Sequence, residues 1–295
     1  MDFEYIIENN QVTITKYTGT SKEVIIPNKI ETLLVTVIGY KAFACKKLTS
    51  IILPENLVTI GQQAFGSNKL TSISFPKTLM TINKYAFESN KLISIILPEN
   101  LTTISEGIFY CNQLTSISLP KNITTIGQFA FSQNKLTRVH LPETVITIDS
   151  GAFARNNLTN INLPNNITTI NYRAFYHNML TDISLPKNLT TIGAYAFRYN
   201  HLTSINLSNN VQQINYDAFG RNEFVTSIIL PKKFRTKQQI EYIFGIHLQK
   251  FNNDYKFMKP YLIEGLRDYV QYHFCDIIIE YMPSNEWIRE YLSES

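Results

Sequence analysis

The sequence predicts a repeat solenoid, a stack of 22-residue β-turn-β-turn coils with short helical turns, because three residue types recur with one period. Phenylalanine occupies one column at Phe43, Phe65, Phe87, Phe109, Phe131, Phe153, Phe175, Phe197 and Phe219. Isoleucine occupies a second column at Ile38, Ile60, Ile82, Ile104, Ile126, Ile148, Ile170, Ile192 and Ile214. Asparagine occupies a third at Asn68, Asn90, Asn112, Asn134, Asn156, Asn178, Asn200 and Asn222. Three columns in register indicate that every unit follows the same backbone path.

The strand and bend of one coil can be read from the unit Leu114–Lys135, LTSISLPKNITTIGQFAFSQNK. Ile117 and Leu119 alternate with polar residues, which predicts a short strand with one buried face. Pro120 ends that strand, because proline has no N–H to donate to a ladder. A second short extended segment is expected over residues 123–126, after the Pro-x-Asn bend.

The second half of the unit predicts a turn whose phenylalanine points inward. Asn134 closes the coil, and its amide can satisfy backbone groups that would otherwise lack partners inside the turn. One unit cannot bury its own apolar face, but stacked units share a continuous core of isoleucine and phenylalanine. At roughly 4.8 Å per coil, the eight full units from about Leu48 to Glu223 predict a stack roughly 40 Å long.

Both ends of the stack are expected to be capped, because a terminal coil would otherwise expose its core. Residues 1–23 predict an N-terminal cap of two short strands, and residues 24–231 the solenoid. Helix-forming residues follow, which predicts a small α-helical C-terminal region over residues 232–295, either a cap or a partner-docking module. Three helices are expected there, over Thr236–Gln249, from Pro260, and from near Ser284.

The composition argues against several function classes. The net charge of +4 and the pI of about 8.8 are too small an excess for a dedicated nucleic-acid-binding protein. Cys45, Cys111 and Cys275 are too few for a disulfide framework. The sequence has no HExxH or Cys-x-x-Cys motif and no phosphate-cradling glycine loop. We therefore expect no metal site, no cofactor, no catalytic residue and no enzymatic activity.

The N-terminal residues MDFEYIIENNQ carry acidic side chains where a secretory signal peptide would carry basic ones, and no apolar segment follows them. The sequence also lacks a run of about 18 apolar residues, so no membrane-spanning helix is expected. These features predict a protein that is cytoplasmic as synthesised. Secretion into a host cell stays open, by a route that needs no cleavable signal peptide.

The repeat pattern L-T-x-I-x-L-P…T-T-I-G-x-x-A-F resembles the BspA-type leucine-rich repeats of bacterial surface and secreted proteins, which also occur in parasitic protists and in pathogen effectors. The resemblance covers about residues 20 to 231. It implies a leucine-rich-repeat stack and a binding role, in adhesion or in host-protein interaction. Many members of that family carry cysteine where this chain keeps asparagine.

The expected function is therefore that of a protein–protein interaction scaffold. We expect a bacterial effector or secreted protein that binds a host macromolecule, a host protein in the first place, through the later repeats and the helical tail. A surface adhesin-like binding protein is one alternative. An enzyme acting through the C-terminal tail, where Cys275 lies beside Asp276, is another, although that tail shows no convergent polar constellation.

A polar cluster is expected on the face formed by the first strands. The outward positions there hold mostly small residues, but the middle coils carry Arg138, His140 and Asp182, together with Asn160 and Asn162. This cluster is either a partner-binding patch or ordinary variation on a solvated surface.

The second candidate surface is the column that precedes the asparagines in the later coils. This column and its neighbours along the chain are Arg155, Tyr176, His177, Arg198, Tyr199 and Arg221. Arginine and tyrosine are enriched at the hot spots of protein interfaces, so this ridge predicts a partner-binding site. A solvated edge, with tyrosines lying over apolar neighbours, is the competing interpretation.

Overall fold

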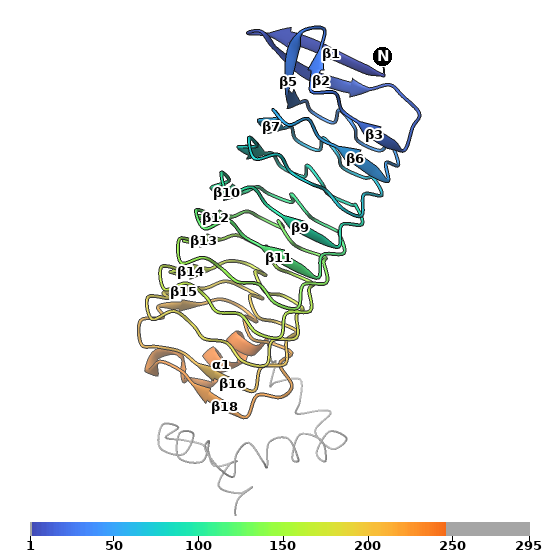
Figure 1. Cartoon of the computed structure of the whole chain (residues 1–295). Helices are drawn as coiled ribbons and strands as arrows, with labels where there is room; N and C mark the ends of the chain where they lie inside the picture. The colour runs from blue at the N-terminus through green and yellow to red at the C-terminus, as the bar shows by residue number, and fades with distance from the viewer. Residues whose placement is uncertain (1, 246–295) are drawn as a thin grey trace, which may run out of the picture.

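The computed structural model describes residues 2–245, which wind into an elongated stack of about 10 coils with a step of 22 residues (Figure 1). The predicted solenoid is confirmed by this architecture. The helices expected from Pro260 and from near Ser284 lie outside the described residues, as do Cys275 and Asp276.

The N-terminal end of the stack begins with an antiparallel hairpin of β1 (Phe3–Glu8) and β2 (Gln11–Tyr17). Asn9 and Asn10 form its two-residue turn with φ of 49° and 59°, a conformation that asparagine tolerates well. Strand β2 pairs in parallel with β5 (Leu33–Ile38), and β4 (Lys29–Ile30) pairs antiparallel with β5. The hairpin thus covers the first coil and continues its sheet.

The second extended segment of each coil forms the more continuous sheet face, and each strand there is two residues long. These strands are β7 (Thr59–Ile60), β8 (Thr81–Ile82), β10 (Thr103–Ile104), β12 (Thr125–Ile126), β13 (Thr147–Ile148), β14 (Thr169–Ile170), β15 (Thr191–Ile192) and β17 (Gln213–Ile214). Successive strands pair in parallel, isoleucine beside isoleucine, in three runs. The isoleucine column is buried throughout.

The first strands of the coils form a ladder that is interrupted. They are β3 (Glu23–Ile25), β6 (Ser50–Ile52), β9 (Ser94–Ile96), β11 (Ser116–Ser118), β16 (Ser204–Asn206) and β18 (Ser227–Ile229). The coils that carry Arg138, Asn160 and Asp182 form no strand at this position, apart from one isolated bridge between Asn162 and Ser184. The coil at residues 72–74 also lacks this strand, so the ladder is interrupted at two places.

The core is organised around the phenylalanine column. All nine rings from Phe43 to Phe219 are fully buried, and each is stacked on the next. Neighbouring centroids lie 5.1–5.9 Å apart with interplanar angles of 5–22°. Offset stacking of this kind is favourable beyond the burial of area alone. The rings therefore join each coil to its neighbours along the whole stack.

The asparagine column joins the coils by hydrogen bonds. The side-chain amide of Asn156 donates to the carbonyl oxygens of Phe131 (2.9 Å) and Phe153 (3.2 Å), which belong to two successive coils. Its Oδ1 accepts from the N–H of Leu136 (3.0 Å). The same pattern runs from Asn68 to Asn222. The predicted role of this column, satisfying backbone groups inside the turn, is confirmed.

Two residues of every coil adopt a left-handed backbone conformation, one two positions before the buried phenylalanine and one two positions after it, with φ of 52–64°. The first left-handed column is Lys41, Gln63, Tyr85, Gly107, Phe129, Gly151, Arg173, Tyr195 and Asp217. The second is Cys45, Ser67, Ser89, Cys111, Gln133, Arg155, His177, Tyr199 and Arg221. This conformation costs about 1–2 kcal/mol for a residue with a Cβ. It persists because the N–H groups of the left-handed residues donate to carbonyls on the next coil, as in Gln133 N–H to Ala154 O at 2.9 Å.

The C-terminal end is covered by η1 (Lys232–Phe234) and α1 (Lys237–Phe244). Thr236 caps α1 by accepting from the N–H of Gln239, and Gly245 ends it with φ of 62°. The helix predicted from Thr236 is confirmed as α1, which ends at Phe244 with Gly245 as its C-cap, and residues 246–249 of the predicted range lie outside the described residues.

Helix α1 takes the place of a further coil. The carbonyls of Tyr242 and Ile243 accept from the N–H groups of Asp217 (2.7 Å) and Phe219 (3.2 Å), as the carbonyls of a next coil do elsewhere in the stack. Ile243 is fully buried against the last coil. The described part of the tail is thus integral to the stack.

Asp217 lies buried between the last coil and α1. Its carboxylate pairs with the Arg198 guanidinium at 2.7 Å, and the two side chains are 5% and 24% exposed. Burial raises the pKa of Asp217, and the charges of Arg198 and Arg221 oppose that shift. A Cβ at Gly220 or Gly245 would collide with this carboxylate. Arg198 therefore compensates the charge that is buried at the C-terminal cap.

Replacing Asn156 with alanine should lower the free energy of unfolding by about 2–4 kcal/mol, because two carbonyls and one N–H in the buried turn lose their partners. Urea denaturation measures the change. The matched control is Asn157→Ala, since that neighbouring side chain is exposed and should shift stability by less than about 0.5 kcal/mol. Equal losses in the two variants would contradict this role of the asparagine column.

Replacing Arg198 with alanine should destabilise the protein by about 3 kcal/mol at neutral pH, because the Asp217 carboxylate stays buried without its counter-ion. The folded-state pKa of Asp217 then lies still further above its unfolded value. The difference in free energy of unfolding between wild type and variant should therefore grow as pH rises through the raised pKa of Asp217. Below that pKa the difference should be smaller.

Urea unfolding of both proteins at about pH 5 and about pH 8 checks this pH dependence. Arg138→Ala serves as the control, because that side chain is exposed. If Arg198→Ala lowers the free energy of unfolding by the same amount at both pH values, the ion pair with Asp217 does not stabilise the cap.

Candidate partner-binding surface

The predicted ridge residues lie together on the turn side of the later coils. We call Arg155, Tyr176, His177, Arg198, Tyr199 and Arg221 the turn ridge. Arg155, His177, Tyr199 and Arg221 occupy the second left-handed column with φ of 55–57°. Their common backbone conformation sends four side chains out of the same position on four successive coils. The arrangement is therefore set by the backbone and not by long-range folding of a loop.

Ring contacts order the centre of the turn ridge. Tyr176 and Tyr199 meet edge to face at 5.6 Å, and His177 lies 5.9 Å from Tyr199. The Arg198 guanidinium lies over the Tyr199 ring at 4.8 Å and over the Tyr195 ring at 5.4 Å. Arg198 also pairs with Asp217, so its charge is largely committed inside the protein. Arg155 and Arg221 are the exposed cations of the ridge.

A further arginine, Arg173, lies next to the turn ridge in the first left-handed column. Its guanidinium is over the rings of Tyr172 (4.9 Å), Tyr176 (5.1 Å) and Tyr195 (5.2 Å). Stacking on three rings holds an exposed cation in one orientation at low entropic cost on binding. The repeat period alone could not show that Arg173 stacks on three rings.

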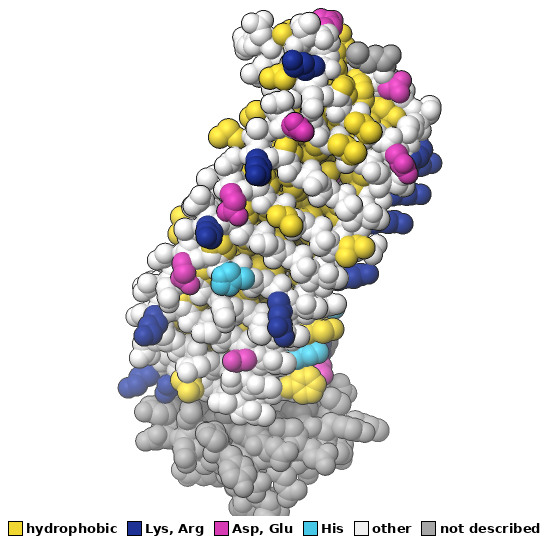
Figure 2. All heavy atoms as spheres, viewed as in Figure 1, with side chains coloured by type: hydrophobic (Ala, Val, Ile, Leu, Met, Phe, Trp, Pro, Cys, Tyr) yellow, Lys and Arg dark blue, Asp and Glu magenta, His cyan; other side chains and the backbone are white. Residues whose placement is uncertain are grey.

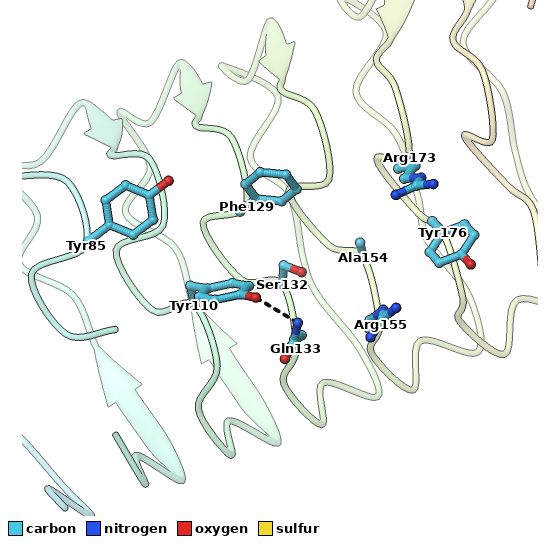
Figure 3. Close-up of a pocket in the computed structure, with 9 residues that line it drawn as sticks. All are labelled: Tyr85, Tyr110, Phe129, Ser132, Gln133, Ala154, Arg155, Arg173 and Tyr176. Atoms are coloured by element: carbon cyan, nitrogen blue, oxygen red, sulfur yellow. Dashed lines mark hydrogen bonds between the residues drawn. The ribbon is translucent and has the colours of Figure 1, made fainter. Parts of the chain in front are cut away.

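At the N-terminal end of the turn ridge the surface is hollowed into a trough of about 410 Å³ (Figure 3). It is lined by Tyr85, Tyr110, Phe129, Ser132, Gln133, Ala154, Arg155, Arg173 and Tyr176. Tyr85 and Tyr110 lie toward one end, and Arg173 and Tyr176 toward the other (Figure 3). Gln133 donates a hydrogen bond to the Tyr110 hydroxyl at 2.8 Å. The trough joins two predicted residues, Arg155 and Tyr176, with others that sequence reasoning did not select.

Tyr85 belongs to a polar network at the rim of the trough. Its hydroxyl donates to Glu106 at 2.7 Å, and Lys84 pairs with the same carboxylate at 2.8 Å. Burial and the hydrogen bond to Glu106 raise the pKa of Tyr85 to about 12. The hydrogen bonds from Lys84 and Tyr85 lower the pKa of Glu106. The negative charge of Glu106 is thus already paired with Lys84 and Tyr85.

The residues predicted on the first-strand face occupy different positions of the repeat from those of the turn ridge. Arg138, His140 and Asp182 are exposed, and their side chains make no hydrogen bond or ion pair with residues 2–245. The N-terminal part of the same face is apolar instead, with Ile25, Ile52 and Ile96 71%, 56% and 81% exposed.

Two edges of the stack carry contrasting charge patterns, visible in Figure 2 as one edge with dark-blue side chains and one row that alternates dark blue with magenta. The position after the asparagine holds Lys69, Lys91 and Lys135, and Lys47 occupies the same repeat position in the first coil. The position after the proline holds Glu55, Lys77, Glu99, Lys121 and Glu143. Sequence reasoning selected neither column, although reading the lysine position once per period would have found the basic edge.

Neither metal ligation nor a membrane span is found in the part of the chain that the structure describes. No group of three or more histidine, cysteine, aspartate or glutamate side chains between residues 2 and 245 could hold a metal ion. Over the same range, no helix is long and apolar enough to cross a bilayer.

Solved structures of leucine-rich-repeat proteins from bacteria resemble this fold. The pneumococcal vaccine antigen PcpA is 19% identical, with a TM-score of 0.51 over 79% of this chain and 81% of that one. The leucine-rich-repeat protein of T. pallidum is 25% identical, with a TM-score of 0.43 over 67% and 86%. A leucine-rich cell surface protein from Faecalibacterium prausnitzii is 18% identical, with a TM-score of 0.44 over 82% and 96%. The likeness to PcpA shows the fold alone.

No curated protein is significantly similar to the chain. The family described as the BspA type leucine-rich-repeat region (6 copies) matches residues 36–156 and 124–248, which is most of the chain. This match agrees with the 22-residue period, the stacked phenylalanines and the parallel two-residue strands. The chain therefore belongs to the BspA-type leucine-rich-repeat family.

Proposed function

We propose that this protein is a protein–protein interaction scaffold and that the turn ridge binds the partner. The observation that carries the proposal is the left-handed column, which projects Arg155, His177, Tyr199 and Arg221 from successive coils at one backbone angle. None of these four side chains is needed for the core. A rigid row of cationic and aromatic side chains has the composition of interface hot spots.

Order and exposure favour the turn ridge over the first-strand face. Tyr199 is 39% exposed, yet it is held by Tyr176, His177 and Arg198. Side chains that are already fixed lose less entropy on binding. Arg138 on the strand face lacks such contacts among the described residues. The ridge therefore offers more binding free energy for the same contact area.

The biological setting that we propose is a bacterial effector or secreted protein whose partner is a host protein. Membership of the BspA-type family supports a binding role at a cell surface or in a host, and the adhesin-like alternative uses the same ridge. The C-terminal residues 246–295, where the enzyme alternative would place its chemistry, lie outside the described range.

Replacing Tyr199 and Arg221 together with asparagine should weaken partner binding by about tenfold or more, since each is expected to act as a hot spot. Asparagine is chosen because it tolerates the left-handed conformation of both positions better than alanine. Proteins retained from a host-cell extract by the wild-type chain are identified by quantitative mass spectrometry. The dissociation constant of the purified partner is then measured for wild type and variant.

The control for this experiment changes the other face: Arg138→Ala with Asp182→Asn should leave the same partner bound with unchanged affinity. Circular dichroism melting verifies that both double variants are folded. The turn ridge would be refuted as the binding surface if its variant kept full affinity, or if only the strand-face variant lost it.

A further inference from the structure

The trough exists because the repeat carries small residues at two successive coils. The position after the buried phenylalanine holds Tyr110, Ser132, Ala154 and Tyr176 in consecutive coils. Ser132 and Ala154 are 4% and 5% exposed and lie between the two larger tyrosines. The trough is therefore about two coils long, roughly 10 Å, with a tyrosine at each end (Figure 3).

Glycines in the first left-handed column shape the side of the trough. The column runs Tyr85, Gly107, Phe129, Gly151, Arg173, so residues with large side chains alternate with glycines. A Cβ at Gly151 would meet the Phe129 ring at 2.5 Å, which shows that the ring leans over the glycine of the next coil. The ring of Phe129 thereby presents its surface along the trough and lies 6.3 Å from the ring of Tyr110.

The lining combines aromatic rings with cations and contains no carboxylate. Arg155 is exposed, and its side chain makes no hydrogen bond or ion pair with residues 2–245. Arg173 is held by the rings of Tyr172, Tyr176 and Tyr195. The remaining polar groups are hydroxyls and the amide of Gln133. A ligand for this lining needs a negative charge, hydroxyls and an apolar face.

We propose that the trough binds an acidic sugar, with a pyranose ring packed against Tyr110 and Phe129 and its carboxylate paired with Arg155. A pyranose offers C–H groups on its faces and hydroxyls at its edge, which matches aromatic walls beside Gln133 and Ser132. A carboxylate is suited to the planar fork of a guanidinium. A volume of about 410 Å³ holds one or two sugar rings.

The geometry favours a sugar over an acidic peptide. An extended peptide needs backbone hydrogen-bond partners, and the turn N–H groups here already donate to the next coil. Examples are Phe129 N–H to Ser150 O (3.0 Å) and Arg155 N–H to Tyr176 O (2.7 Å). Tyrosines also lie at both ends of the trough, which limits the length of extended chain that it could hold (Figure 3). This ligand class goes beyond the protein partner proposed for the turn ridge.

The test uses the full chain and a disaccharide of glucuronic acid and N-acetylglucosamine, titrated at millimolar concentration. Saturation-transfer NMR should show transfer to the pyranose C–H protons, and the affinity follows from the titration. Arg155→Asn should weaken binding about tenfold or more, as expected for loss of one charge-assisted pair. The neutral disaccharide with glucose in place of glucuronic acid should bind the wild-type chain correspondingly more weakly.

Two further variants distinguish binding in the trough from non-specific attraction of the acidic sugar to the positive charge of the protein. Ala154→Tyr repeats the residue found in this column at Tyr110 and Tyr176, so it should fold normally, fill the trough and abolish binding. Arg221→Asn removes a charge from the same left-handed column outside the trough and should leave sugar binding unchanged. The ridge variant of Tyr199 and Arg221 should likewise keep sugar binding, so failure of the proposed protein interface and failure of the sugar site are distinguishable.

Four results would overturn the proposal. They are no saturation transfer to the acidic disaccharide, equal affinity for the neutral disaccharide, full binding by Ala154→Tyr, and binding of a hexaglutamate peptide in the trough as tight as that of the disaccharide. The last result would assign the trough to acidic protein segments instead.

Discussion

The structure depends on one constraint: in each turn, the N–H groups of the left-handed residues and of the buried phenylalanine must donate to carbonyls on the next coil. The turn of each coil places two residues in the left-handed region, where a non-glycine residue is strained, and its N–H groups then point along the stack. The asparagine amide completes the arrangement by joining the carbonyls of two successive phenylalanines. No coil can satisfy its own turn, so stability is shared between neighbours and is lost at an uncovered end. The hairpin β1–β2 and helix α1 supply the missing neighbours at the two ends.

The same constraint creates the proposed binding surface. Because the residues of the second left-handed column are fixed by the ladder and their side chains lie outside the core, the sequence at these positions is free to vary. In the early coils this column holds serine, cysteine or glutamine, and in the later coils it holds arginine, histidine and tyrosine. Once such side chains stand about one coil spacing apart, they contact one another, and the rings around Arg173 and Tyr199 follow. The trough arises in the same way where Ser132 and Ala154 leave room between Tyr110 and Tyr176.

Much of the fold was predictable from the sequence, since period, strand alternation and the asparagine column each have a local physical reason. The turn ridge could be placed as a column for the same reason. Three features were not predicted. The lean of Phe129 over Gly151 depends on the contact between coils, and a single unit does not show it. The burial of Asp217 with Arg198 depends on where α1 docks. The end of α1 at Gly245 lay in the sequence as a glycine signal, but the apolar spacing that continues to Leu248 argued for a longer helix.

The alternating column Glu55, Lys77, Glu99, Lys121, Glu143 has a consequence for how so repetitive a chain finds its register. Near-identical units can stack with one coil left out, because the phenylalanine and asparagine columns fit equally well after a slip of a whole period. Such a slip would set glutamate against glutamate or lysine against lysine on that edge, whereas the native order sets opposite charges side by side. Each mismatch costs only a few tenths of a kcal/mol on an exposed surface. Every such mismatch disfavours the slipped stack. This charged column, which belongs neither to the core nor to the turn ridge, therefore favours stacking of the coils in their sequence order.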